Sequence, residues 1–263
     1  ATGKCFWFSN ASSMSVSCLG TVNDAPALPS ITSTVRANQS AGFSIVTWSA
    51  ATNAVNRIPH LLNATPGLII TKSTSESNNW RIWHTATGKD KYLGFDTSVA
   101  NTYSSYWSTS EPDSSTFGVW HDAGGANNHG DMVAYCFAPV EGYSAFGTYE
   151  GNGNANGPFV FTGGMRPKWI LLKSIDTGGT GYDWLIYDTE RDTYNVGYQF
   201  LCPNTNNTEL RREGDTSDKT DRYIDILSNG FKIRNSNANY NANANTFLWV
   251  AFAEHPFKTA RAR

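Results

Sequence analysis

Short runs of β-branched and aromatic residues, separated by polar clusters, recur along the whole chain. Residues 43–48 (Phe-Ser-Ile-Val-Thr-Trp) and residues 67–72 (Gly-Leu-Ile-Ile-Thr-Lys) have the composition of strands. The run 80–84 alternates, which places Ile82 on one face of a strand and Trp83 on the other. No segment of helical length repeats its apolar positions with a period of about 3.6 residues. We therefore expect an all-β fold, a sandwich or a barrel.

An internal repeat relates the two halves of the sequence. Sliding the chain along itself brings residues 66–73 onto residues 167–174, and it brings Thr47-Trp48 onto Thr148-Tyr149. Further blocks match in the same order: 80–85 with 184–189, 115–119 with 229–233, and 132–138 with 247–253. Chance similarity would not keep this order, so the pattern predicts one set of strands present in two copies.

The repeat sets the expected domain boundaries. We predict two tandem, related β-sandwich units of the jelly-roll or lectin-like kind, at residues 41–142 and 143–263, each of a size usual for one sandwich. Residues 1–40 match neither copy, so we expect an N-terminal extension that packs as an extra strand or serves as a connector. The stretch between the copies is short, which favours close packing of the two units.

Low charge is the main feature of the composition. Charged residues make up 16% of the chain and the net charge is -2, whereas aromatic residues reach 13%. Soluble domains usually carry about 25% charged residues. Binding to nucleic acid is not expected, because it needs clustered Lys and Arg to neutralise phosphates. A membrane span is not expected either, because no run approaches the ~18 apolar residues that one requires. This balance suits an extracellular or virion protein.

The four cysteines bear on cross-links and cofactors. Cys5 and Cys18 lie in one N-terminal segment and could form a disulfide, although sequence alone does not fix the pairing. Cys136 and Cys202 lie in strand-like runs, where a free cysteine is usually buried. No CxxC motif or Cys/His ligand spacing occurs, and no loop carries a full set of calcium ligands. We therefore predict no metal and no cofactor.

Several motifs in fixed order resemble a known repeat family. They lie at 42–48, 66–72, 134–138 and 141–149 in the first copy, and at 151–153, 157–164, 166–170, 227–234 and 251–257 in the second. Together they are similar to a repeat family found in predicted tail-fibre and virion proteins of marine and cyanobacterial phages. The resemblance implies a place on the virion surface, a role in host attachment, other virion proteins as partners, and a homo-oligomer, commonly a trimer. It implies no catalytic residues, and residues 1–40 fall outside it.

Two loops contain residues that could support chemistry. The segments 121–122 (His-Asp) and 129–131 (His-Gly-Asp) could hold a metal or an acid/base pair, but the spacing fits no familiar ligand motif. A solvated loop is the favoured interpretation. Residues 213–218 (Glu-Gly-Asp-Thr-Ser-Asp) imitate the acidic spacing of sandwich glycosidases that resemble laminarinases. They lack interleaved apolar residues, so a surface turn headed by Glu213 is favoured over a catalytic strand.

A second acidic group flanks the strand predicted at residues 184–187. It consists of Asp183, Asp188, Glu190 and Asp192, and the position that matches Asp188 in the first copy is His84. Charged residues at strand ends commonly keep a sheet soluble, and we favour that role here. The sequence also lacks GxSxG, HExxH and phosphate-loop motifs. We therefore do not expect an enzyme.

Aromatic residues beside loops are the best candidates for ligand contact. Tyr103, Tyr106, Trp107 and Trp120 lie at or near loops and have weak counterparts in the second copy. The stretch 101–107 has the mixed polar and aromatic composition that recognition surfaces favour. Core packing is the competing interpretation. It is also the expected role of the tryptophans in repeat-matched strands, which are Trp48, Trp80, Trp83, Trp169, Trp184 and Trp249.

The sequence thus favours a bacteriophage structural or adhesive module, such as a tail fibre, a head fibre or a decoration protein, with host-surface glycans as candidate ligands. A stand-alone carbohydrate-binding, lectin-like module is the alternative. A glycan depolymerase is the weakest hypothesis. The first hypothesis depends on the family resemblance, and the other two depend on aromatic and acidic loop residues, because a fold alone does not specify a function.

Overall fold

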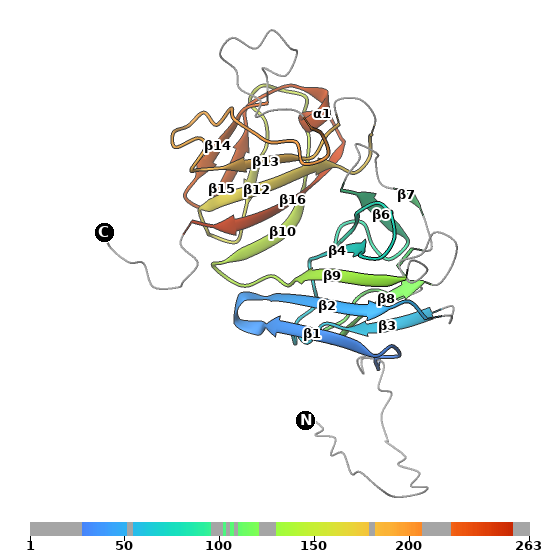
Figure 1. Cartoon of the computed structure of the whole chain (residues 1–263). Helices are drawn as coiled ribbons and strands as arrows, with labels where there is room; N and C mark the ends of the chain where they lie inside the picture. Colours follow the sequence, from blue (N-terminus) through green and yellow to red (C-terminus); the bar gives the residue numbers. More distant parts are fainter. Residues whose placement is uncertain are drawn as a thin grey trace, which may run out of the picture.

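The computed structural model describes residues 28–51, 55–95, 102–103, 106–107, 110–120, 130–178, 182–206 and 222–254. Almost all regular structure in these ranges is β-strand, paired antiparallel (Figure 1). The exceptions are the single-turn helix α1 (Ala238–Asn241) and the 3-10 turn η1 (Gln39–Ala41). The prediction of an all-β sandwich fold is confirmed.

The first half of the chain forms a sandwich of one large and one small sheet. The large sheet runs in the order β1 (Ser33–Asn38), β2 (Phe43–Ser49), β9 (Asp131–Phe137), β4 (Leu68–Ser73), β5 (Arg81–His84), β6 (Lys91–Gly94) and β7 (Thr102–Tyr103). The small sheet pairs β3 (Val55–Pro59) with β8 (Thr116–Trp120). Alternate residues of β2 are buried, as the period of two requires, and Val46 packs with Ile58 and Phe117 between the sheets.

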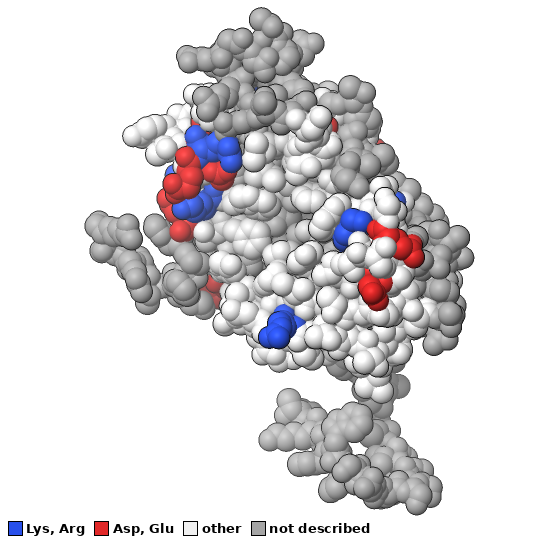
Figure 2. All heavy atoms as spheres, in the orientation of Figure 1, with Lys and Arg blue, Asp and Glu red and all other residues white. Residues whose placement is uncertain are grey.

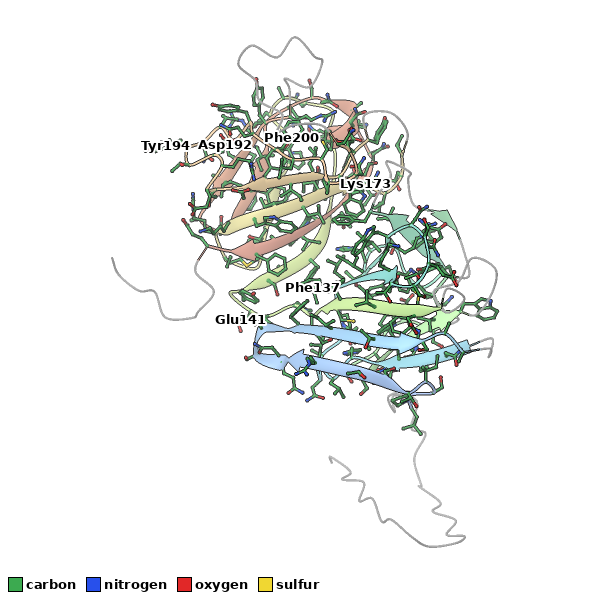
Figure 3. All side chains as sticks on the ribbon, in the orientation of Figure 1. Phe137, Glu141, Lys173, Asp192, Tyr194 and Phe200 are labelled. Carbon is green, nitrogen blue, oxygen red and sulfur yellow. The ribbon has the colours of Figure 1, made fainter. Side chains whose placement is uncertain are left out.

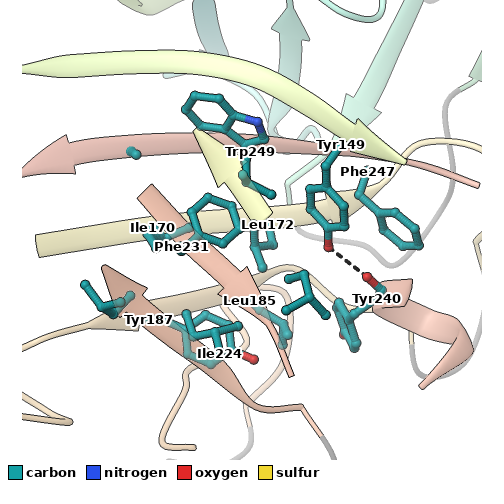
Figure 4. Close-up of a cluster of buried hydrophobic side chains, with 14 of the residues drawn as sticks. Tyr149, Ile170, Leu172, Leu185, Tyr187, Ile224, Phe231, Tyr240, Phe247 and Trp249 are labelled. Carbon is teal, nitrogen blue, oxygen red and sulfur yellow. Dashed lines mark hydrogen bonds between the residues drawn. The ribbon is translucent and has the colours of Figure 1, made fainter. Parts of the chain in front are cut away.

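The second half repeats this arrangement. Its large sheet runs in the order β10 (Ser144–Glu150), β16 (Thr246–Ala253), β12 (Pro167–Ser174) and β13 (Leu185–Asp188). Its small sheet runs in the order β11 (Phe159–Phe161), β15 (Gly230–Ile233) and β14 (Ile224–Leu227). Between them lies an aromatic core in which Tyr149 stacks on Phe247 and donates a 2.8 Å hydrogen bond to the Tyr240 carbonyl (Figure 4).

Strand order and register agree between the two halves. The order β2-β9-β4-β5 recurs as β10-β16-β12-β13. Trp48 is paired with Met132 in the first sheet, and the matching Tyr149 is paired with Phe247 in the second. The sequence repeat is therefore a repeat of strand pairing. The division into tandem domains at residues 41–142 and 143–263 stays a prediction.

The buried positions agree as well. Ile69 pairs with Cys136 and is fully buried in the core of the first sandwich. The matching Ile170 pairs with Ala251 and is fully buried in the core of the second. Equivalent residues of the repeat thus occupy equivalent surroundings.

The two large sheets pack against each other through the faces that point away from their own small sheets. Leu68 and Ile82 of the first sheet share one cluster with Leu171 and Val250 of the second. Trp184 lies fully buried in this cluster, and its indole Nε1 donates a 2.7 Å hydrogen bond to the Gly94 carbonyl. Figure 1 shows the second sandwich above the first, with β9 and β10 at the boundary. The layers therefore form one continuous packed body.

The N-terminal residues and the cysteines were also subjects of sequence predictions. Strand β1 is an extra strand at the edge of the first sheet. An extra strand was one of the two roles expected for residues 1–40; the other was a connector. Cys136 is buried in β9, as predicted; Cys202 is buried too, but it lies outside the strands, and Cys5 and Cys18 lie outside the described residues. In the described ranges no helix is long and apolar enough to cross a bilayer.

Candidate functional site

Two of the predicted ligand-contact residues belong to the core, so this prediction needs correction. Tyr106 and Trp107 are only 3% and 2% exposed. Their rings pack edge to face 5.0 Å apart, and the Tyr106 hydroxyl lies 3.0 Å from Thr71 Oγ1. Burial raises the pKa of Tyr106 to about 12. Both side chains fill the space between the sheets of the first sandwich, where no surface ligand reaches them, and the core-packing interpretation of these residues is correct.

The other two predicted contact residues are Trp120 and Tyr103. Trp120 is half-buried, and its backbone N–H donates a 3.2 Å hydrogen bond to the Tyr106 carbonyl. Tyr103 pairs with Lys91 through the backbone of β7, and its side chain lies outside the described residues. A ligand role for Trp120 and Tyr103 stays a prediction.

The acidic residues around β13 are engaged in local structure. The Asp183 carboxylate accepts a 2.8 Å hydrogen bond from the Asn204 side chain, and Glu190 forms a 2.7 Å ion pair with Lys168. Asp188 and Asp192 organise the loop that follows β13, as described below. The other chemically tempting segments, at 121–122, at 129 and at 213–218, lie outside the described residues. Within the described part of the chain, no group of three or more His, Cys, Asp or Glu residues could hold a metal ion.

The loop after β13 lines a groove on the second sandwich. It starts at Asp188, whose carboxylate accepts a 2.8 Å hydrogen bond from the Arg191 backbone and forms a 3.0 Å ion pair with the Arg191 side chain. The Asp192 carboxylate then accepts hydrogen bonds from the backbone N–H groups of Tyr198 and Gln199. One carboxylate therefore closes the loop by joining its beginning to its end.

The loop is also fixed to strand β14. The Asn195 side chain donates a 2.9 Å hydrogen bond to the Ile226 carbonyl and accepts a 2.8 Å hydrogen bond from the Ile226 N–H. Gly197 and Ile224 exchange two backbone hydrogen bonds of 2.7 and 3.1 Å. Beyond the loop, Phe200 is buried against Tyr187 in the core. These attachments leave the loop tip little conformational freedom.

The tip presents an exposed tyrosine beside a groove. Tyr194 is 84% exposed, and Figure 3 shows it with Asp192 at the outer end of the second sandwich, away from the boundary with the first. The groove has a volume of about 450 Å³. We name it the Tyr194 groove; its lining residues are Arg191, Asp192, Thr193, Tyr194, Asn195, Val196, Tyr198, Gln199 and Tyr223.

The chemistry of the Tyr194 groove is aromatic and amide-rich, with its charges largely paired. Arg191 is neutralised by Asp188, and the carboxylate of Asp192 is satisfied by two backbone N–H groups. What remains for a ligand is the face of a tyrosine ring and polar groups such as the side chain of Gln199. Such a surface suits a neutral, hydroxyl-rich ligand that combines a flat apolar face with many hydrogen-bonding groups.

The groove was not predicted from the sequence, although the sequence contains a signal for it. Residues 192–199 read Asp-Thr-Tyr-Asn-Val-Gly-Tyr-Gln, which has the same mixture of polar and aromatic residues as 101–107. Composition alone does not distinguish the two stretches. Asp192 and Asn195 fix the second stretch in a loop that leaves Tyr194 exposed, whereas Tyr106 and Trp107 of the first stretch are buried.

Comparison with known proteins adds a family but no activity. A family model described as a domain of unknown function (DUF7483) matches residues 20–256. Neither the curated proteins nor the solved structures include a significant match. Because the family model covers both sandwiches and the groove, the chain belongs to the DUF7483 family.

Proposed function

We infer that this protein is a non-enzymatic structural and adhesive module on the surface of a bacteriophage particle, as part of a tail fibre, a head fibre or a decoration layer. The likeness of its repeat motifs to phage fibre and virion proteins supports this inference. The described surface agrees with it, because charges on the face in Figure 2 gather in a few small groups separated by broad uncharged areas. Such a surface can pack beside other particle proteins without strong charge repulsion.

The proposed ligand is a glycan of the host surface, and the Tyr194 groove is the observation that carries this part of the proposal. A pyranose ring has a flat C–H face that can stack on an exposed tyrosine, while its hydroxyls need hydrogen-bonding partners. The groove offers Tyr194 for stacking, with Tyr198, Gln199 and Tyr223 around it. Its fixed loop lowers the entropy that would be lost on binding.

Binding without catalysis is the favoured use of this groove. Glycoside hydrolysis needs two carboxyl groups on opposite sides of the scissile bond, one of which donates a proton. Among the described residues, Asp192 is the carboxylate that lines the groove; it already accepts two backbone hydrogen bonds, and Asp188 outside the groove is held by Arg191. These groups are used to shape the loop. We accordingly propose adhesion, with other virion proteins as partners and a homo-oligomer as the working assembly.

A glycan array probed with the full chain tests the proposed ligand. Tyr194→Ala should weaken binding to any glycan that wild type retains by about tenfold or more, equivalent to about 1.4 kcal/mol. Leu61→Ala is the control, because it removes another exposed large apolar side chain, on the first sandwich and away from the groove. Equal binding by wild type and Tyr194→Ala would exclude the groove as the glycan site.

The same groove favours one second candidate, a lectin-like module that belongs to no virion. Negative-stain images of purified phage particles labelled with an antibody against this chain separate the two candidates. Label at fibres or on the capsid supports the virion proposal. Unlabelled particles, together with glycan binding by the free protein, support the lectin.

A further inference from the structure

We propose that strand β11 is a docking edge for a second copy of this chain. The two copies would join their three-stranded sheets into one through antiparallel pairing of β11 with β11. This proposal does not depend on glycan binding, because β11 and the Tyr194 groove lie at opposite edges of the small sheet.

The side chains of β11 identify this edge. Phe159 and Phe161 are 46% and 59% exposed, whereas Val160 between them is buried in the core. Two large apolar side chains therefore lie on the outer face of one short strand. Exposed phenylalanines on an edge strand promote association between chains. Native proteins usually prevent such association by placing a charge, a proline or a covering segment at the edge.

The backbone hydrogen bonds show which groups of β11 are available. The Thr162 N–H donates to the Asn229 carbonyl at 3.1 Å, and the Ile233 N–H donates to the Pro158 carbonyl at 3.0 Å. In an antiparallel pair, bonding residues alternate, so Val160 also faces β15. The N–H and C=O groups of Phe159 and Phe161 consequently point to the outer edge. Among the described residues, no strand pairs with that edge.

The equivalent strand in the first sandwich has a covered edge. Arg57 of β3 pairs with Gly118, and Phe159 of β11 pairs with Lys232, which matches Gly118 in the repeat. Along the outer edge of β3, Ser30 donates its N–H to the Arg57 carbonyl at 2.9 Å and accepts from the Arg57 N–H through its hydroxyl at 2.7 Å.

The outer face of β3 is covered too. Arg57 reaches the Glu111 carbonyl at 3.3 Å and forms a 2.7 Å ion pair with Asp113, so its side chain is almost completely buried. The same position in β11 carries the exposed Phe159. The two copies of the repeat thus differ most clearly here: one edge is closed by the chain itself, and the described part of the chain leaves the other edge open.

A second β11 matches this edge because the strand is self-complementary. A two-fold axis beside Val160 sets Phe159 of one copy opposite Phe161 of the other, and Phe161 opposite Phe159. About four main-chain hydrogen bonds can form in this register, since both residues direct their N–H and C=O outward. All four rings then lie on one face as two directly opposed aromatic pairs, which is a favourable cross-strand arrangement. A closed, isologous pair results.

The expected pair is weak in dilute solution. Each phenylalanine contributes at most roughly 200 Å², and both are already partly covered, so the contact remains well below the ~800 Å² per partner of stable complexes. Copies held close together on one particle would gain from the high effective concentration. The edge is therefore suited to joining neighbouring copies in an assembly.

Sedimentation velocity of the full chain over a wide concentration range tests the proposal. Wild type should shift from monomer toward dimer as concentration rises. Phe161→Glu should weaken this dimer by about tenfold or more, because it removes one partner of each aromatic pair and places a carboxylate opposite an apolar ring. Tyr194→Glu is the control: Tyr194 is more exposed than Phe161 but lies away from β11, so this change should leave the dimer unchanged.

Hydrogen exchange at the same concentrations gives a second, residue-level readout. The amides of Phe159 and Phe161 should exchange more slowly as the dimer forms, while the Val160 amide, already bonded to β15, should not change. Any of three results would overturn the proposal: the wild type stays monomeric, it forms a trimer that does not dissociate to dimers, or its dimer is unaffected by Phe161→Glu.

Discussion

Phe137 and Phe252, which occupy equivalent positions in the two halves of the repeat, lie against each other with their ring centroids 6.0 Å apart and their planes at 66°. Phe137 pairs with Leu68 in its own sheet, and Phe252 pairs with the matching Trp169 in the other. The matching strands β9 and β16 therefore each pack one face into the core of their own sandwich, and through the other face they contact each other. Two sheets with apolar residues on both faces stabilise each other in this way.

Truncation of Trp184 should loosen the contact between the two sandwiches. Trp184→Ala removes a fully buried indole, its hydrogen bond to Gly94 and its edge-to-face contact with Phe95. We expect a loss of about 3–5 kcal/mol in the free energy of unfolding, measured by urea denaturation. Trp80→Ala, at the matching but more exposed position, should cost clearly less. Equal losses would contradict the role assigned to Trp184.

Gly67 should not tolerate a side chain, because the second sandwich covers it. A Cβ atom added there would lie 2.5 Å from the ring of Phe146. Gly67→Ala should therefore cost about 1–3 kcal/mol of stability in thermal or urea unfolding. The double variant Gly67→Ala with Phe146→Leu should recover part of that loss, since the smaller side chain can give way. Strictly additive losses would contradict the contact.

Asn241 should be essential for the turn between β10 and β11. Its amide nitrogen lies within 3.0 Å of oxygens of Asn152, Asn154 and Asn235, and its own oxygen accepts from the Asn152 N–H. Asn241→Leu leaves these buried groups unpaired and should cost about 2–4 kcal/mol. Asn243→Leu alters an exposed asparagine nearby and should be nearly neutral. Hydrogen exchange of the Asn152 amide, faster only in Asn241→Leu, checks the mechanism.

Stability should decrease as the pH falls from 6.5 toward 4, and His84 should be one cause. Burial lowers the pKa of His84 to about 4, although the Trp249 backbone partly opposes this change. Above pH 6.5 the imidazole is neutral in both the folded and the unfolded chain. Between 6.5 and 4 only the unfolded chain takes up the proton, so the folded state loses up to about 3 kcal/mol through this residue.

Urea denaturation at pH 7.5, 5.5 and 4 measures this effect. His84→Asn is the appropriate comparison, because its side-chain oxygen can still accept the hydrogen bond that the Ala86 N–H donates to His84 Nδ1. The variant should show a smaller decrease than wild type over this range. Some decrease should remain, since burial also lowers the pKa of His60. An identical decrease in both proteins would show that His84 is not responsible.

The sequence by itself determined the strands and their repetition. Alternation placed Ile82 and Trp83 on opposite faces, and the structure buries them in two different clusters. The order of matched blocks anticipated that Ile69 and Ile170 occupy equivalent positions, each in its own sheet. Side-chain alternation within a strand is a local property, and the similarity of repeated segments is visible in the sequence itself, so both can be read without the fold.

Tertiary structure alone decided which aromatic residues face solvent. The stretches 101–107 and 192–199 have similar composition, yet Tyr106 is buried and Tyr194 is exposed. The difference comes from distant partners: Thr71 and Trp120 meet Tyr106 from other strands, whereas Asp192 and Ile226 hold the second loop with its tyrosine outward. Exposure depends on contacts between segments far apart in the chain, and no local pattern contains that information.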